Sequence, residues 1–329
     1  MKALFYTGTE AMEVRETAAP EPGAGDVVLD VSFCGICGSD MHAYHGKDPR
    51  RVPPMILGHE AIGIARSGRH QGKRVAVNPL MVCSSCPYCL CGRDNLCPER
   101  ELIGMRLPGA YAEQVAVADD NLYPVADALS SEDAALAEPL ACAVHAVRLG
   151  KQLAGAPMEE LRTVVLGGGA IGVLSALVLA EQGVHDLWIA EPNSGRAGVL
   201  QQALGAKVYD PNSTGPEAAS ADLIVDAVGA GATRKAASAL AKPGSWIVHI
   251  GLQDEAPGLD TRRMTLQEIG FIGTYCYTKA DFATALQLLE DGLIASHDWI
   301  EVRPLDDGPQ AFADIHNGDA PPKIILATG

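Results

Sequence analysis

Five of the nine cysteines in this 329-residue chain fall within one stretch of fifteen residues, CSSCPYCLCGRDNLC. Four of these thiols are separated by three, three and eight positions: Cys83, Cys86, Cys89 and Cys97. Thiolates are strong zinc ligands, and four from one loop can surround the ion tetrahedrally with no position left open. The spacing therefore predicts a structural zinc site within residues 83–97.

Two other interpretations fit parts of the same pattern. The first three cysteines match the run that holds an iron–sulfur cluster in bacterial ferredoxins, but the fourth cysteine there comes four residues after the third. Cys97 comes eight residues after Cys89. Free or disulfide-paired thiols are the second alternative. Cys91 is left over in each case and is interpreted as a bystander.

A second group of possible metal ligands lies in three separate segments. CGICGSDMH spans residues 34–42, GHE spans 58–60, and AEPLA spans 137–141. A carboxylate inside the apolar AEPLA run is costly to bury unless it is paired or bound to a cation. Three protein ligands with one open position are the arrangement of a catalytic zinc. The candidate ligands are Cys37, His59, Glu60 and Glu138.

Each of these four residues also has a purely structural interpretation when it is taken alone. They could be a core thiol, a satisfied core histidine, a surface charge and a carboxylate on a helix face. Their presence together, in a chain that also carries a nucleotide-binding pattern, favours the metal site.

The nucleotide-binding pattern is the glycine-rich stretch GGGAIG at residues 167–172, which fits G-x-G-x-x-G. A strand-like run precedes it, a helical run follows, and an acidic residue ends the next strand about twenty residues on. Glycines allow close approach to a pyrophosphate, and the helix N-terminus supplies N–H donors. The alternative is a glycine-rich turn without a ligand. The candidate cofactor residues are Gly167, Gly169, Ala170, Ile171, Gly172, Glu191 and Arg196.

The position of Glu191 favours NAD, because a carboxylate accepts hydrogen bonds from both ribose hydroxyls and repels a 2′-phosphate. Arg196 could pair with a 2′-phosphate and weaken that preference, or it could be a solvated helix charge.

The elements that must position these residues change in pattern along the chain. Residues 1–150 contain short β-like runs such as DVVLDVSF and AEQVAVA, together with one helical stretch, 130–150, in which Pro139 is expected to produce a kink. After residue 160, strand-like and helical runs alternate, which predicts βαβ units and a parallel sheet.

Composition limits the partners. The net charge is −16, which disfavours binding to nucleic acid and to anionic membranes. No window approaches the ~20 apolar residues of a membrane span, and the N-terminus lacks a signal-peptide pattern. We expect a cytoplasmic protein with reduced thiols, in which Cys34, Cys142 and Cys276 pack in the core.

The motifs GICGSDMH, GHE, C-x2-C-x2-C-x7-C, AEPLA and GGGAIG occur in this order. In that order they resemble the zinc-dependent medium-chain dehydrogenase/reductase superfamily, of the alcohol and sorbitol dehydrogenase type. The resemblance spans nearly the whole chain. It implies an α/β fold in which a Rossmann domain with a doubly wound parallel sheet, residues 150–276, is inserted into a GroES-like β-rich catalytic domain, residues 1–149 and 277–329.

The resemblance also implies roles for individual residues. Cys37 and His59 are ligands of the catalytic zinc, and Glu60 and Glu138 complete or exchange within its shell, with the direct ligand left open. Asp40 matches the carboxylate that orients the ligand histidine. Ser39 matches the hydroxyl that takes the substrate proton, and His42 the outer member of that relay.

The implied activity is oxidation of a secondary alcohol, a polyol or sugar alcohol, to a ketone with NAD⁺. Two zinc ions per chain and a homo-oligomer, a dimer or homotetramer, are expected. Vicinal-diol and L-threonine 3-dehydrogenases are alternatives, and a non-catalytic NAD-binding protein is an alternative of another class. A zinc-free quinone reductase lacks these ligands, and a zinc-ribbon nucleic-acid binder does not fit the charge.

Two positions depart from the family pattern. Gly-Asp-Arg-Val is usual after the first metal motif, and the chain has Gly72-Lys73-Arg74-Val75. Cys276, in YCY, stands where animal sorbitol dehydrogenases carry an arginine that contacts the polyol, which weakens a specific sorbitol assignment.

Overall fold

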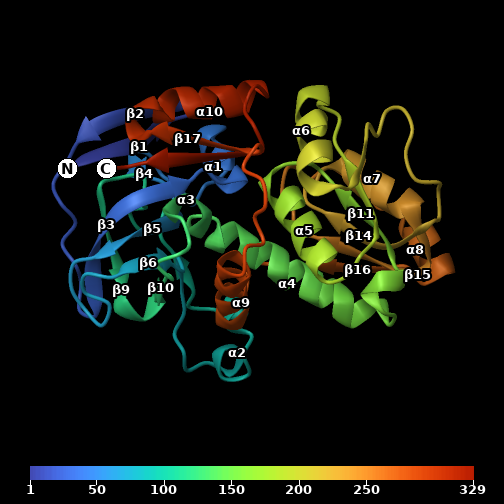
Figure 1. Cartoon of the computed structure of the whole chain (residues 1–329), viewed down its shortest axis with the longest axis horizontal. Coiled ribbons are helices and arrows are strands. Elements are labelled where there is room, and N and C mark those ends of the chain that lie inside the picture. The colour runs from blue at the N-terminus through green and yellow to red at the C-terminus, as the bar shows by residue number, and fades with distance from the viewer. The chain divides into compact units, whose positions relative to one another are not determined.

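Separate sets of strands divide the chain into two units in this computed structural model, which describes residues 1–329 (Figure 1). The first boundary falls at Ala141, inside a long helix, and a short late segment returns to unit 2, which the sequence pattern did not indicate. Unit 1 comprises Met1–Ala141, Thr278–Gly292 and Ile300–Gly329, and unit 2 comprises Cys142–Tyr277 and Leu293–Trp299.

A seven-stranded sheet forms the centre of unit 1, in the order β10-β6-β5-β3-β18-β17, with β9 also paired to β3. The C-terminal strand β18 joins this sheet by pairing antiparallel with β3, so the chain returns to the unit in which it began. The strands are β3 (Asp26–Gly35), β5 (Glu60–Ala65), β6 (Arg74–Val77), β9 (Gln114–Ala118), β10 (Leu122–Pro124), β17 (Ile300–Pro304) and β18 (Lys323–Ala327).

Two smaller sheets and five helices complete unit 1. The three-stranded sheet has the order β2-β1-β4, and β7 pairs with β8. These strands are β1 (Lys2–Gly8), β2 (Ala11–Glu16), β4 (Met55–Ile56), β7 (Leu80–Met81) and β8 (Glu101–Leu102). The helices are α1 (Gly38–Tyr44), α2 (Pro87–Leu90), α3 (Ser131–Ala134), α9 (Lys279–Glu290) and α10 (Gly308–Asn317).

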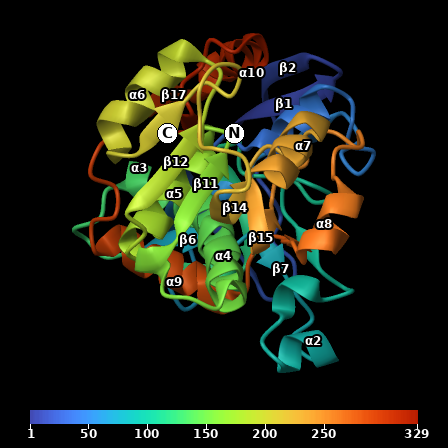
Figure 2. The same ribbon diagram turned by 90° about the vertical axis from the view of Figure 1, so that its right-hand side faces the viewer.

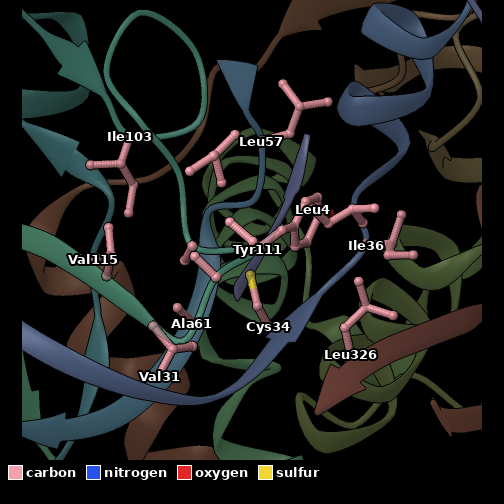
Figure 3. Close-up of a cluster of buried hydrophobic side chains, with 14 of the residues drawn as sticks. Leu4, Val31, Cys34, Ile36, Leu57, Ala61, Ile103, Tyr111, Val115 and Leu326 are labelled. Atoms are coloured by element: carbon pink, nitrogen blue, oxygen red, sulfur yellow. The ribbon is translucent and has the colours of Figure 1, made fainter. Parts of the chain in front are cut away.

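The core of unit 1 follows from the alternating pattern of its strands. In β3, Val27, Leu29 and Val31 point to one face and are buried, as the period of two predicts. Figure 3 shows part of this core, in which Tyr111 lies beside Cys34. Cys34 is fully buried among apolar side chains, so its expected role in core packing is confirmed. Cys142 and Cys276 are only half-buried, so the same expectation was wrong in placing them within the core.

Unit 2 contains a six-stranded sheet in the order β13-β12-β11-β14-β15-β16, in which every pair is parallel. This confirms the parallel sheet predicted from the alternating runs. The strand order reverses between β11 and β14, and ligands of such sheets bind at the carboxyl ends of the strands at this point. The strands are β11 (Arg162–Leu166), β12 (Asp186–Ala190), β13 (Lys207–Tyr209), β14 (Ala221–Asp226), β15 (Ala241–His249) and β16 (Gly270–Gly273).

Helices cover both faces of this sheet. Figures 1 and 2 show α5 and α6 on one face and α7 and α8 on the other. The strands are buried on both sides, which explains their continuous apolar runs such as VVL in β11. The helices are α5 (Ala170–Glu181), α6 (Ser194–Leu204), α7 (Gly231–Leu240) and α8 (Thr261–Gln267).

The helical stretch at 130–150 is two helices. Ser130 caps α3 by accepting from the Asp133 N–H, and α4 (Ala137–Ala154) begins after a two-residue turn. Pro139 therefore lies in the first turn of α4, where its missing N–H has no helical partner to lose, and it does not kink the helix interior. At 18 residues α4 is the longest helix, and no helix is long and apolar enough to cross a membrane.

Candidate metal centres and nucleotide loop

The four spaced cysteines converge in the loop around α2. The sulfur atoms of Cys83 and Cys97 are 3.5 Å apart, those of Cys86 and Cys89 3.5 Å, and those of Cys83 and Cys89 3.9 Å. A Zn–S bond of about 2.3 Å in a tetrahedron places its sulfurs about 3.8 Å apart. All four sulfurs lie within 4.8 Å of one another. The donor set therefore fits a closed zinc site.

The same distances exclude the disulfide alternative in this structure, because bonded sulfurs lie about 2 Å apart. All nine cysteines are free. Cys91 does not belong to the four-sulfur group, and its thiol is directed toward the carbonyl oxygen of Tyr88 at 3.4 Å.

The pKa values of the thiols in this loop differ because their surroundings differ. Hydrogen bonds from Ser85 and from the Cys86 N–H lower the pKa of the Cys83 thiol to about 6. Burial and the neighbouring thiols of Cys86 and Cys97 raise the pKa of Cys89 to about 12. A zinc ion bound by the four sulfurs would stabilise the thiolate form of each of them.

A second convergence brings together Cys37, His59 and Glu60, whose ligand atoms lie within 4.8 Å of one another. Cys37 is the N-cap of α1 and accepts from the Ser39 N–H at 3.4 Å. Glu60 opens β5, His59 immediately precedes that strand, and both are buried. A helix start and a strand start, 22 positions apart in sequence, thus hold three of the four expected ligands in one place.

Asp40 lies behind this group and is completely buried. One carboxylate oxygen accepts from the Cys37 N–H at 3.2 Å and from the Tyr111 hydroxyl at 2.6 Å. The other lies 3.6 Å from Nδ1 of His59, and neither of these two buried atoms has a hydrogen-bond partner. With Nδ1 directed at a carboxylate, Nε2 is the nitrogen available to a metal ion.

Lys323, which the sequence reasoning missed, lies beside the same group. It opens β18, only 1% of its side chain is exposed, and its ammonium pairs with Glu60 and donates to the Ile36 carbonyl at 2.9 Å. Burial lowers the pKa of this lysine, but the charges of Glu60 and Cys37 outweigh burial and raise it. The available signal was a lysine at the head of an otherwise apolar strand, KIILA.

Glu138 lies outside the three-ligand group. It is buried at the second position of α4, where the helix N-terminus favours a negative charge. Burial first, and then the charges of Glu60, Asp40 and Glu138, raise the pKa of the Cys37 thiol. Glu138 is therefore close enough to influence the site electrostatically.

Ser39 and His42 are three residues apart on α1, a spacing that places two side chains on one helix face. Burial lowers the pKa of His42, and the nearby charges of Lys47 and Arg51 act in the same direction against Asp48. The Ser39 hydroxyl accepts a hydrogen bond from Arg51 at 3.2 Å. Arg51 was also missed by sequence reasoning, because nothing in the run PRRVPP marks its second arginine as buried.

The glycine-rich turn in unit 2 connects β11 to α5. Gly167 has φ +102°, and a Cβ on Gly172 would lie 1.8 Å from the Gly167 carbonyl oxygen. Only glycine fits these two positions. The turn continues through Gly169, the N-cap of α5, so that Ala170 and Ile171 open the helix and its N-terminal N–H groups face the end of the turn.

Glu191 follows β12 and is held by this turn. Its carboxylate accepts from the Gly168 N–H at 3.1 Å and from the Asn193 N–H at 2.8 Å, and Arg196 lies 3.6 Å away. A carboxylate offers about four lone-pair positions, so acceptor capacity remains for two ribose hydroxyls. The loop, the helix N-terminus and Glu191 fit an adenine dinucleotide.

Two family models match the chain. One describes the alcohol dehydrogenase GroES-like domain and matches residues 23–127, and the other describes a zinc-binding dehydrogenase and matches residues 204–326.

Similar proteins cover almost the full length. The chain is 33% identical over 342 aligned positions to a 2-dehydro-3-deoxy-L-galactonate 5-dehydrogenase of Pseudoalteromonas atlantica, covering 99% of this chain and 98% of that protein. It is 29% identical to the L-galactonate-5-dehydrogenase of Escherichia coli K12, with 90% and 89% covered. An alcohol dehydrogenase from E. coli CFT073, solved with NADH, has a TM-score of 0.88 at 25% identity, with 99% of both chains covered.

Proposed function

This chain belongs to the zinc-dependent medium-chain dehydrogenase/reductase superfamily, of the polyol dehydrogenase type, and we propose that its substrate is a polyhydroxylated secondary alcohol, either a sugar alcohol or a sugar acid. It is an alcohol dehydrogenase that uses a nicotinamide cofactor and oxidises a secondary alcohol to a ketone. Two relatives named for galactonate chemistry support the sugar-acid branch of the proposal.

The observation that carries the proposal is the convergence of the half-buried Cys37 with the buried His59 and Glu60, with Asp40 behind them. Three converging donors of mixed type are the donor set of a catalytic zinc, whereas four thiolates close the other site. A carboxylate in place of a second thiolate favours oxygen ligands such as a substrate hydroxyl. We propose that these three residues hold the catalytic zinc and that the four-cysteine loop holds a structural one.

Within this proposal each residue of the site has a separate role in the reaction. A bound zinc ion supplies Lewis-acid polarisation of the hydroxyl oxygen, and a bound nicotinamide accepts the hydride. Asp40 fixes the His59 ring so that Nε2 faces the site. Ser39 takes the proton of the substrate hydroxyl, and His42, on the same face of α1, passes a proton on to solvent.

The cofactor proposed is NAD, with NADP less favoured. Glu191 supports this choice, because its buried carboxylate disfavours a 2′-phosphate. One solved relative holds NADH and another holds NADP, so the proposal of NAD depends on Glu191. The pairing of Arg196 with Glu191 leaves that arginine less free to attract a phosphate.

Three further assignments are also proposals. Unit 2 is the NAD-binding domain and unit 1 the catalytic domain, which the parallel sheet and the metal ligands support. Nine free thiols support a reducing, cytoplasmic location. We also propose a homo-oligomer, a dimer or tetramer.

The test is NAD⁺ reduction across a panel of L-galactonate, xylitol, a vicinal diol (2,3-butanediol), a simple secondary alcohol and L-threonine. Turnover of L-galactonate or xylitol in preference to the other three is the expected result. Preference for 2,3-butanediol or L-threonine would replace the substrate class while keeping the reaction. No NADH formation from any of the five by the zinc-loaded protein would favour a non-catalytic NAD-binding protein.

A further inference from the structure

Arg51 is the middle member of a row of alternating charges that runs from the surface to His59. The side chain of Arg50, which is 47% exposed, forms two hydrogen bonds to Asp48. Asp48 in turn pairs with Arg51 at 2.9 Å, and Arg51 lies 3.4 Å from Asp40. Asp40 then faces Nδ1 of His59.

The Arg51 guanidinium is fully enclosed, with 0% of its side chain exposed, and all its edges have partners. Nε donates to the Gly104 carbonyl at 2.9 Å, and Nη1 donates to Asp48 and to the Ser39 carbonyl at 3.0 Å. Nη2 donates to the Ser39 hydroxyl oxygen at 3.2 Å and faces Asp40. Ser39 is thus held twice, through its backbone and through its side chain.

The contact between Arg51 and the Ser39 hydroxyl fixes which of the two groups donates the hydrogen bond. A serine hydroxyl has one donor and two acceptor positions, and a guanidinium can only donate. Arg51 therefore occupies one lone pair and can never receive the serine proton. One lone pair and the O–H remain, which are the two positions a hydroxyl needs to gain a proton from one neighbour while giving its own to another.

We propose that Arg51 is a positioning residue for the reaction: it orients the Ser39 hydroxyl so that its free lone pair accepts the substrate proton. In that step the substrate O–H bond breaks, a new O–H bond forms on Ser39, and the proton that Ser39 carried leaves toward His42, so the serine stays neutral. The inference rests on the proposed function, since it requires Ser39 to act on an alcohol.

Arginine is needed here because of its shape as well as its charge. A lysine at position 51 could keep a positive charge between Asp40 and Asp48, but a single ammonium group cannot reach Gly104, Asp48 and both Ser39 oxygens from one plane. Arg51→Lys therefore removes the orientation of Ser39 with little change in net charge.

The experiment is a double-mutant cycle of Arg51→Lys with Ser39→Ala, followed by kcat and KM with L-galactonate or xylitol, whichever the panel selects, and by zinc content. We expect Arg51→Lys to lower kcat at least tenfold in the otherwise unchanged enzyme and less than twofold in the Ser39→Ala enzyme. KM for NAD⁺ and zinc content should stay unchanged. Arg51→Gln, which keeps an amide donor without the fork, is carried through the same cycle in case the lysine variant folds poorly.

The matched control is Arg50→Lys. It makes the same chemical change at the neighbouring arginine, which also donates to the Asp48 carboxylate. It should change kcat less than twofold in both backgrounds. Equal kcat losses for Arg51→Lys with and without the Ser39 hydroxyl would overturn the inference, as would a loss under twofold in the unchanged enzyme. Full turnover of Ser39→Ala would instead refute the proton relay, and a wild-type enzyme inactive on every alcohol would refute the proposed function.

Discussion

Glu60 belongs to the candidate metal group and also pairs with a buried lysine, and these two roles together account for the burial of that lysine. Its carboxylate belongs to the group that can hold a metal ion, and it is also paired with the Lys323 ammonium. A buried carboxylate without a counter-ion is strongly destabilising, so Lys323 stabilises Glu60 whenever the metal is absent.

Replacing Lys323 by methionine should therefore destabilise the metal-free protein more than the zinc-loaded protein. Breaking a buried ion pair costs about 3–5 kcal/mol, and a bound cation can offset part of that loss. Denaturant unfolding with a chelator and with added zinc measures both values. Lys207→Met is the control, because its lysine is 56% exposed and its pairing is worth at most about 1 kcal/mol. An equal loss in both metal states would contradict this account of Lys323.

The position of Glu191 leads to a prediction about cofactor selectivity. A hydrogen bond to a charged group contributes about 1.5–3 kcal/mol, so Glu191→Ala should raise the KM for NAD⁺ by roughly ten- to a hundredfold. The KM for NADP⁺ should change less, because the same substitution removes the repulsion of its phosphate. Steady-state kinetics with both cofactors test this, with Glu181→Ala at the exposed end of α5 as control. An unchanged ratio of the two KM values would remove Glu191 from the selectivity argument.

At the scale of elements, the carboxylate of Asp186 joins the first residues of three neighbouring strands in unit 2. Asp186, the first residue of β12, accepts from Arg162 of β11 at 2.7 Å and from Lys207 of β13 at 2.8 Å. These hydrogen bonds, from Lys207 first and then from Arg162, lower the pKa of Asp186 to about 2. One side chain therefore links three adjacent strands at the amino ends of the sheet.

This pKa predicts a pH dependence of stability. A carboxylate whose pKa is depressed on folding stabilises the native state above its unfolded pKa of about 4, and that contribution is lost as the pH falls toward 2. Because Asp186 is 32% exposed, we expect about 1 kcal/mol after solvent screening. Asp186→Asn should be less stable than wild type by this amount at pH 6, and the difference should vanish near pH 2. Denaturant unfolding followed by circular dichroism measures it, and a difference that stays constant across this range would contradict the assignment.

The elements that the sequence predicted best are those with a strong period. The alternating apolar residues of DVVLDVSF and the βαβ runs after residue 160 led directly to β3 and to the parallel sheet. The break at 135–136 was misplaced to Pro139, because a proline in a helical run can equally mark the first turn of a new helix. Propensity and spacing do not distinguish those two positions.

Only those residues of the candidate site that belong to a recognisable sequence motif could be predicted. Spacing was sufficient for the four cysteines, and their sulfurs do converge. Lys323 and Arg51 could not be predicted, because only the tertiary fold brings them to the site. Lys323 lies 263 positions after its partner Glu60, and Arg51 lies 12 positions after its partner Ser39. A long side chain at the head of a strand or in a loop gives no local sign that it will be buried.

At the scale of the whole molecule, both candidate metal groups belong to unit 1, although this unit is assembled from three stretches of chain. The last stretch contributes Lys323 to the site, and β18 fixes that stretch by pairing with β3 just before Cys37. Loss of the C-terminal strand would therefore disturb the site as well as the sheet. We therefore propose two metal ions in this unit, only one of which takes part in turnover.

The most direct test of this claim is the zinc content and alcohol-dependent NAD⁺ reduction of the wild-type protein beside Cys37→Ser. We predict two zinc ions per chain in the wild type, one in the variant, and turnover only in the wild type, since Cys37 belongs to the open group and not to the four-cysteine loop. Circular dichroism should show the same fold for both proteins. A Cys37→Ser protein that keeps wild-type turnover, or a fully active wild type without zinc, would contradict the account.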